Sequence, residues 1–195
     1  MSTTTAINEK LVQYFNEALA MENAAEDRNR QRIEETPLPL TRQQLQYHLE
    51  ETFLQQERLR KIILSLGGGP TSAKASLPML LPGNMETLSN TVKEAAKSVT
   101  SDSGKRAVAA EKELMQSKQD AIIENAEITS YKILIQMAEE TGHKDVIPDL
   151  SKSLQEEVSM SNFIMGNSPL VLRMLLPKAA EIGSSQEDMK RAASA

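Results

Sequence analysis

The sequence predicts an all-α protein, built as a four-helix bundle with one long crossover connection. Long stretches without glycine or proline carry apolar residues at every third or fourth position, the spacing of one face of an α-helix. No strand-like alternation longer than four residues stands out. The connection in the middle of the chain is much longer than the connections on either side of it. Together these observations favour two helical hairpins joined by one long link.

The first hairpin is expected from two stretches that proline and glycine bound. Residues 7–34 form the first helix. Its apolar stripe is Leu11, Phe15, Ala18 and Ala25. Pro37 and Pro39 end this helix, because proline lacks a backbone N–H and clashes with the preceding turn. Residues 40–66 form the second helix, which the glycines at 67–69 terminate. We therefore expect an antiparallel pair with a short turn.

The second hairpin follows a long connection. Residues 67–84 contain four glycines and three prolines, and a short helix is expected at 85–99. After a break at 101–104, long helices are expected over 105–141 and 146–166. A proline in the first turn of the last of these helices is tolerated, because its missing N–H has no helical partner there. This pair is again antiparallel.

The C-terminal part is expected to add one short helix and a tail. Ser168 and Pro169 are typical of an N-cap and a first helical residue, so a short extra helix is expected at 169–178. The last residues are polar and small. We expect residues 1–180 to form one domain and residues 181–195 to be a flexible tail.

The lengths of the connections decide the expected topology. A long middle link lets the third helix start at the opposite end from a simple up-and-down neighbour, which is the single-crossover arrangement of ferritin-like bundles. The alternative is a plain up-down-up-down bundle with a floppy middle loop.

Composition excludes several classes of protein. The chain has 195 residues, a net charge of −5 and no cysteine, so disulfides, zinc fingers and thiol catalysis are excluded. A mildly acidic chain is a poor nucleic-acid binder, and we expect no nucleic-acid partner. No apolar run reaches the ~20 residues of a membrane span, so no membrane association is expected. The N-terminus has no apolar signal core, which indicates a cytoplasmic protein.

Acidic residues interrupt the apolar stripe of every long helix. Glu22, Glu124 and Glu157 lie directly on a stripe, while Glu51 follows His48 by three residues and Glu127 follows Glu124 by three. At 1.5 Å per residue, Glu22 and Glu51 both lie about 16 Å from the first hairpin turn. The other glutamates lie at matched heights from the second turn. The candidate ligands are Glu22, His48, Glu51, Glu124, Glu127 and Glu157.

A metal centre would explain these buried charges. An unpaired buried carboxylate is costly, and five together would also repel one another. Two divalent ions bring a charge of +4 against −5, and oxygen ligands with one imidazole suit iron or manganese, with zinc as a further alternative. The plainer interpretation is that each glutamate lies at the core boundary or pairs with an Arg or Lys of a neighbouring helix.

Four short motifs resemble the bacterial YciE/YciF-like ferritin-like family. They are LAMENAAEDR at 19–28, HLEET at 48–52, ENAEI at 124–128 and LQEE at 154–157. The resemblance implies a ferritin-like bundle, a di-metal centre at the six positions above, a homodimer and a role in stress. Ferritin-like di-iron sites often have a second histidine on the last helix, where this chain has Met160 and Ser161. Glu156 would replace Glu157 if that helix were rotated.

These observations lead to two hypotheses for function. The first is a di-metal protein that handles iron, oxygen or peroxide, with peroxidase, catalase or oxidase-like chemistry. The second is a non-catalytic, dimerising helical stress or interaction protein with a vestigial metal site. Iron storage is less favoured, because storage needs a closed cage. Dimerisation is also indicated by leucines that one bundle would not cover, at 170, 172, 175 and 176.

Overall fold

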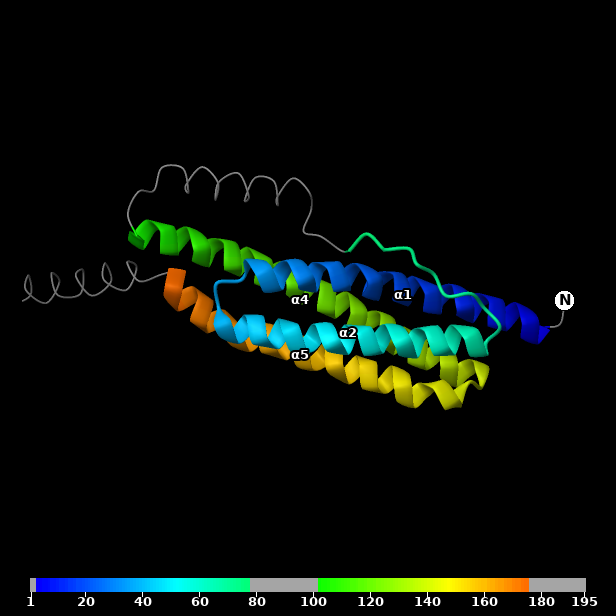
Figure 1. The fold of residues 1–195 in the computed structure, drawn as a ribbon. Helices are drawn as coiled ribbons and strands as arrows, with labels where there is room; N and C mark the ends of the chain where they lie inside the picture. The colour runs from blue at the N-terminus through cyan, green and yellow to red at the C-terminus, as the bar shows by residue number, and fades with distance from the viewer. Residues whose placement is uncertain (1–2, 78–101, 176–195) are drawn as a thin grey trace, which may run out of the picture. The chain divides into compact units, whose positions relative to one another are not determined.

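The computed structural model describes residues 3–77 and 102–175 of the chain, and all long elements within them are helices (Figure 1). The elements are α1 (Thr3–Glu35), α2 (Pro39–Ser65), α4 (Asp102–Thr141), the 3₁₀ turn η1 (Lys144–Val146) and α5 (Ile147–Leu175). Neither described range contains a strand, which confirms the all-α prediction. None of the described helices is long and apolar enough to cross a membrane.

The described residues fall into two compact units. The first contains residues 3–77 and 119–165, and it holds every residue discussed as a candidate ligand. The second contains residues 102–118 and 166–175. The single domain expected over 1–180 stays a prediction, and the expected short helix at 85–99 and tail at 181–195 lie outside the described residues.

The α1–α2 turn is held by side chains that complete the helix ends. Pro39 starts α2 with its φ already suited to a helix. The Leu38 backbone N–H donates to the Thr36 hydroxyl at 3.3 Å. Arg42 reaches back from α2 and donates to the carbonyls of Ile33, at 3.1 Å, and Thr36, at 2.6 Å. These bonds satisfy carbonyls that the end of α1 leaves without helical partners.

The described part of the long link, residues 67–77, runs beside α1 (Figure 1). The Asn16 side chain binds Gly69 and Thr71, the Ala20 carbonyl accepts from the Ala75 N–H, and Lys74 pairs with Asp27. Asn23, farther along α1 than Asn16, binds the Ala73 carbonyl, so the link travels in the same direction as α1. Its start needs glycine, because a Cβ at Gly68 would collide with the side chain of Val12.

The crossover prediction is confirmed by the helix pairing that follows. Asp120 of α4 contacts Arg32 near the end of α1, whereas Tyr131 contacts Glu22 farther back along α1. The two helices are therefore antiparallel, and α4 is parallel to α2. This is the ferritin-like order, and it excludes the up-down-up-down alternative.

The α4–α5 turn is short, as expected. Gly142 takes a left-handed φ of 81°, and the His143 N–H donates to the Ala138 carbonyl at 2.8 Å, which closes the end of α4. The turn η1 leads directly into α5, whose second residue is Pro148.

Two predicted breaks are wrong. Helix α4 begins at Asp102, so the break expected at 101–104 does not interrupt residues 102–104. Helix α5 continues through Gly166 and Pro169 to Leu175, so the separate helix expected at 169–178 is instead the last part of α5 over its described residues. Along α5, Glu157, Met160, Ile164 and Val171 keep the spacing of one buried face across Pro169. That continuous face outweighs the single N–H that proline removes.

Two apolar clusters border the level of the candidate ligands. The larger includes Phe15, Leu59, Leu134 and Leu150. The smaller consists of Leu45, Met160 and Ile164, with Ile33 packed against it. On each of the four helices the candidate ligands lie between these clusters in sequence, so the polar level is enclosed by aliphatic side chains at both ends.

Candidate metal centre

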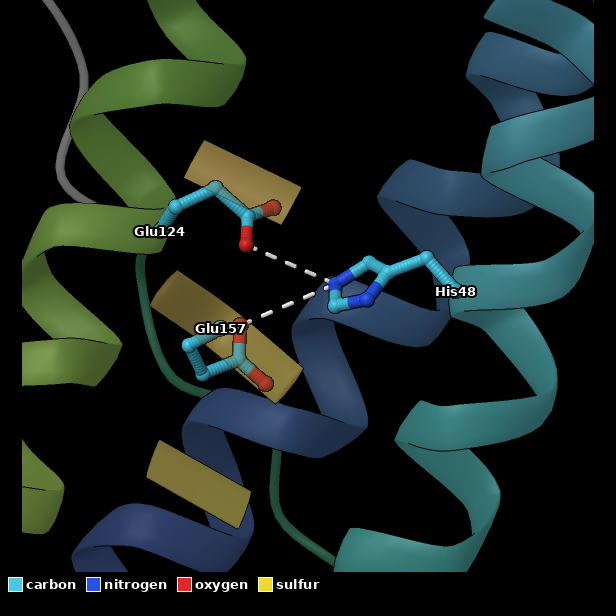
Figure 2. Close-up of side chains that lie close together, drawn as sticks. All are labelled: His48, Glu124 and Glu157. Carbon is cyan, nitrogen blue, oxygen red and sulfur yellow. Dashed lines mark ion pairs between the residues drawn. The ribbon is translucent and has the colours of Figure 1, made fainter. Parts of the chain in front are cut away.

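Three side chains from three helices converge at this level. The Nε2 atom of His48 on α2 lies 3.5 Å from Glu124 Oε2 on α4 and 3.7 Å from Glu157 Oε2 on α5. Figure 2 shows both carboxylates turned toward the same ring nitrogen. One ligand atom from each residue lies within 4.8 Å of the other two, and all three residues are buried. This spacing suits three donors around one cation.

The other ring nitrogen of His48 is held by Glu51. Nδ1 lies 3.1 Å from Glu51 Oε2, one helical turn away on α2. A carboxylate at this position favours the tautomer with the proton on Nδ1, which leaves Nε2 as a metal-binding lone pair. Burial lowers the pKa of His48, but the hydrogen bond to Glu51 and the charges of Glu157, Glu51 and Glu22 outweigh it, and the net pKa is raised.

Glu22 is held by the one tyrosine of the buried level. The Tyr131 hydroxyl donates to Glu22 Oε1 at 2.6 Å, and both side chains are buried. Burial raises the pKa of Glu22 to about 7, although the Tyr131 hydrogen bond and the His48 charge both act to lower it.

The remaining carboxylates, Glu124, Glu127 and Glu157, have no arginine or lysine partner among the described residues. Burial, followed by the charge of Glu127, raises the pKa of Glu124 well above its usual value. Burial, followed by the charge of Glu157, does the same for Glu127. One oxygen each of Glu124, Glu127 and Glu157 is buried without a hydrogen-bond partner. In the described ranges none of these three forms an ion pair with Lys or Arg, so the paired-glutamate interpretation does not apply to them.

The six predicted ligands therefore differ in position. His48, Glu124 and Glu157 form one cluster. Glu51 contacts this cluster at the Nδ1 atom of His48. Glu22 and Glu127 are buried at the same level, and their charges interact with those of the cluster. Whether all six bind metal stays a prediction.

The neighbouring residues that could replace a predicted metal ligand make other contacts. Glu156 accepts two hydrogen bonds from Arg58, at 2.6 and 2.9 Å, so it does not replace Glu157. Ser161 accepts from Asn125 at 3.4 Å, and Met160 lies in the smaller apolar cluster. The second histidine of the chain, His143, lies beyond the end of α4 next to Thr141. A second imidazole is therefore absent from this level.

Gln55 is the contact that sequence reasoning missed. Its side-chain Nε2 donates to Glu157 Oε1 and, at 3.2 Å, to Glu156 Oε2. Gln55 follows His48 by seven residues, a spacing that places both side chains on one face of α2, but no signal in the sequence indicates which carboxylate it contacts.

The residues present fit a metal. Four buried carboxylates with one imidazole match iron, manganese or zinc, and the unpartnered oxygens lie where a cation would satisfy them. Fold and donor set together define a four-helix bundle with a candidate carboxylate–histidine metal centre.

Comparison with known proteins assigns the family. Residues 6–173 match the model described as Domain of unknown function (DUF892), and the chain belongs to this family. This assignment confirms the resemblance to the YciE/YciF-like ferritin-like proteins.

Two solved structures share the fold. A protein from Xanthomonas campestris pv. campestris aligns with a TM-score of 0.64 at 19% identity, over 89% of this chain and 99% of its own. YcfI from Rhodopseudomonas palustris aligns with a TM-score of 0.59 at 25% identity, over 81% of this chain and 92% of its own. No curated protein matches the sequence.

Proposed function

We propose that this protein is a ferritin-like metal protein that binds two iron or manganese ions and handles iron, oxygen or peroxide in the cytoplasm under stress. The observation that carries the proposal is the convergence of His48, Glu124 and Glu157 with carboxylate oxygens that have no other partner. Buried acceptors without donors are rare in native proteins. Here a cation would supply what is missing.

Charge supports two ions better than one. Five carboxylates and one imidazole surround this level, and two divalent ions would leave a net charge near −1. His48, Glu124 and Glu157 would hold the first ion. Glu22 and Glu127 would complete the second position, with Glu51 fixing the imidazole from behind. A bound metal pair would supply redox chemistry toward O₂ or peroxide, while the flanking apolar clusters exclude bulk water.

The second hypothesis, a non-catalytic dimerising helical protein, also has an observation in its favour. The raised pKa values of Glu22, Glu124, Glu127 and Glu157 allow the buried carboxyls to become neutral by taking up protons. A vestigial site could persist in that protonated form without a metal.

Metal analysis after reconstitution separates the two hypotheses. The purified protein is incubated with Fe²⁺ under argon or with Mn²⁺, desalted, and analysed for metal content and for mass in solution. The proposal expects close to two ions per chain and the mass of a homodimer. Metal content near zero would support the vestigial site, and the mass of a large closed shell would point to storage.

A matched pair of variants on α4 localises the metal. Glu124→Gln removes one predicted ligand, whereas Glu140→Gln removes an exposed carboxylate of the same helix. Metal content should fall in the first variant and stay unchanged in the second. Equal loss in both variants, or none in either, would place bound metal elsewhere. Exposure of the Fe²⁺-loaded protein to O₂ or peroxide, followed by absorbance, then tests for oxidation at the site.

A further inference from the structure

We infer that Gln55 is a positioning residue of the metal centre, whose amide holds one oxygen of Glu157 so that the other oxygen faces His48. The inference rests on the proposed metal-binding function and concerns how that site is built. Gln55 itself contacts neither His48 nor Glu124 through any hydrogen bond in the described residues.

The two oxygens of Glu157 have different surroundings. Oε1 accepts a hydrogen bond from Gln55 Nε2–H. Oε2 has no hydrogen-bond partner and lies 3.7 Å from His48 Nε2. A carboxylate tied by one oxygen cannot rotate freely about its last torsion, so the free oxygen stays directed at the centre. Glu157 is thereby prepared to bind metal through Oε2.

A neighbouring ion pair decides which of two adjacent glutamates enters the site. Arg58 donates to both oxygens of Glu156 and to the Ser153 hydroxyl, at 2.6 to 2.9 Å. Bidentate guanidinium–carboxylate contacts are strong and directional. Glu156 is thus retained beside Arg58, and the same Gln55 Nε2 that contacts Glu156 at 3.2 Å also contacts Glu157. The Gln55 amide therefore contacts both Glu156, which Arg58 neutralises, and Glu157, the proposed metal ligand.

The cost of keeping an amide at this position supports a role beyond packing. Gln55 is fully buried, and its own Oε1 has no hydrogen-bond partner. An unmade hydrogen bond of a buried carbonyl lowers stability, and a leucine would suit the aliphatic stripe that continues with Leu59 and Ile62. A residue chosen for packing alone would not carry this penalty.

The adjacent Gln56 offers a matched control. It is also buried on α2, and its Nε2 donates to the Glu22 backbone carbonyl and to Glu26 at 3.2 and 3.1 Å. It has the same side chain, burial and number of donated bonds as Gln55, but it contacts no candidate ligand through a carboxylate. Any general effect of losing a buried amide should therefore appear in both positions.

Cobalt titration of the full-length protein tests the inference. Co²⁺ alone is added to wild type, Gln55→Leu, Gln55→Met and Gln56→Leu, and the visible ligand-field absorption reports both affinity and coordination geometry. Loss of a residue that orients a metal ligand typically weakens affinity about 10- to 100-fold. We expect that loss, with an altered spectrum, in both Gln55 variants, and wild-type values in Gln56→Leu. Gln55→Met keeps the unbranched side chain without an amide donor, so it serves if Gln55→Leu does not fold.

The outcomes separate this inference from the function on which it rests. Wild-type protein that binds no Co²⁺ would overturn the metal-binding proposal and the inference with it. Wild-type protein that binds Co²⁺, with unchanged affinity and spectrum in the Gln55 variants, would overturn the inference alone. An equal change in Gln56→Leu would reduce Gln55 to a packing residue and would also overturn the inference.

Discussion

Two buried carboxylates one helical turn apart on α4 have opposite surroundings. Asp120 accepts hydrogen bonds from Arg28 and Arg32, the closest at 2.6 Å. Glu124 faces a histidine and another glutamate, and one of its oxygens has no partner. The bundle therefore does place arginines against acids that are buried or partly buried, at Asp120 and also at Glu156. Within residues 3–77 and 102–175 no guanidinium pairs with Glu124, Glu127 or Glu157, and this difference marks their level as a candidate site.

The largest expected loss of stability comes from removing the carboxylate that pairs with arginines at Asp120. Asp120→Ala removes the carboxylate that pairs with the buried Arg32 and the partly buried Arg28, and loss of one partner of a buried ion pair costs about 3–5 kcal/mol. Urea unfolding of the metal-free protein, followed by circular dichroism, measures this cost. Glu140→Ala on the exposed face of α4 is the control. A loss below about 1 kcal/mol would mean that the pairing adds little to stability.

The folding stability of the metal-free protein should depend on pH because of the buried carboxyls that have no arginine partner. The pKa of Glu22 is about 7 in the folded state against 4.5 for the free side chain, so the folded state holds this proton more tightly. The tighter proton binding by Glu22 adds about 3 kcal/mol to the free energy of unfolding. This stabilisation is complete below pH 4.5 and disappears as pH rises through 7. The raised pKa values of Glu124, Glu127 and Glu157 act in the same direction. Metal-free stability that rises between pH 5 and 7.5 in urea titrations would contradict this account.

Metal should reverse that trend. Cations bind ionised carboxylates, so metal affinity increases as pH rises. Over the same pH range the metal-free protein loses stability, because its buried carboxyls lose their protons. At pH 7.5, Mn²⁺ at a concentration 100 times its Kd should stabilise the folded state by about 2.7 kcal/mol. The same total Mn²⁺ at pH 5 should have a much smaller effect. Thermal unfolding with and without Mn²⁺ at both pH values provides the measurement, with Mg²⁺ as the control for ionic strength.

The smallest effect comes from neutralising one site carboxylate. At pH 8 without metal, Glu124→Gln should stabilise the fold by about 1 kcal/mol, because an amide removes a charge that burial and Glu127 both oppose. The same variant should lose metal-induced stabilisation. Glu34→Gln, at an exposed position of α1, should change neither quantity by more than about 0.5 kcal/mol. A destabilised Glu124→Gln would show that the ionised carboxylate is stabilised by a contact other than metal.

Helix identity and topology could be predicted from local information. Apolar residues at helical spacing define the buried faces, and the short and long connections define which helices pair antiparallel. The two wrong predictions of a helix break each depended on single residues that disfavour helix. Gly104 and Pro169 disfavour helix by about 1 and about 3 kcal/mol, penalties that are local and modest. Along α5, a buried face that continues to Val171 exceeds such a penalty, and its strength depends on neighbours that the sequence does not identify.

The apolar stripes predict that Glu22, Glu124 and Glu157 face the core, because residues that share a helical face at about 100° per residue point the same way. Which buried carboxylates are neutralised depends on how the helices pack against one another. Glu156 and Glu157 are adjacent, yet Arg58, almost 100 residues away in sequence, pairs with the first, and Gln55 binds the second. These partners come from another helix, and their choice depends on the relative rotation and height of α2 and α5. Electrostatic pairing acts through space over a few ångströms, so it becomes defined only after the helices have packed.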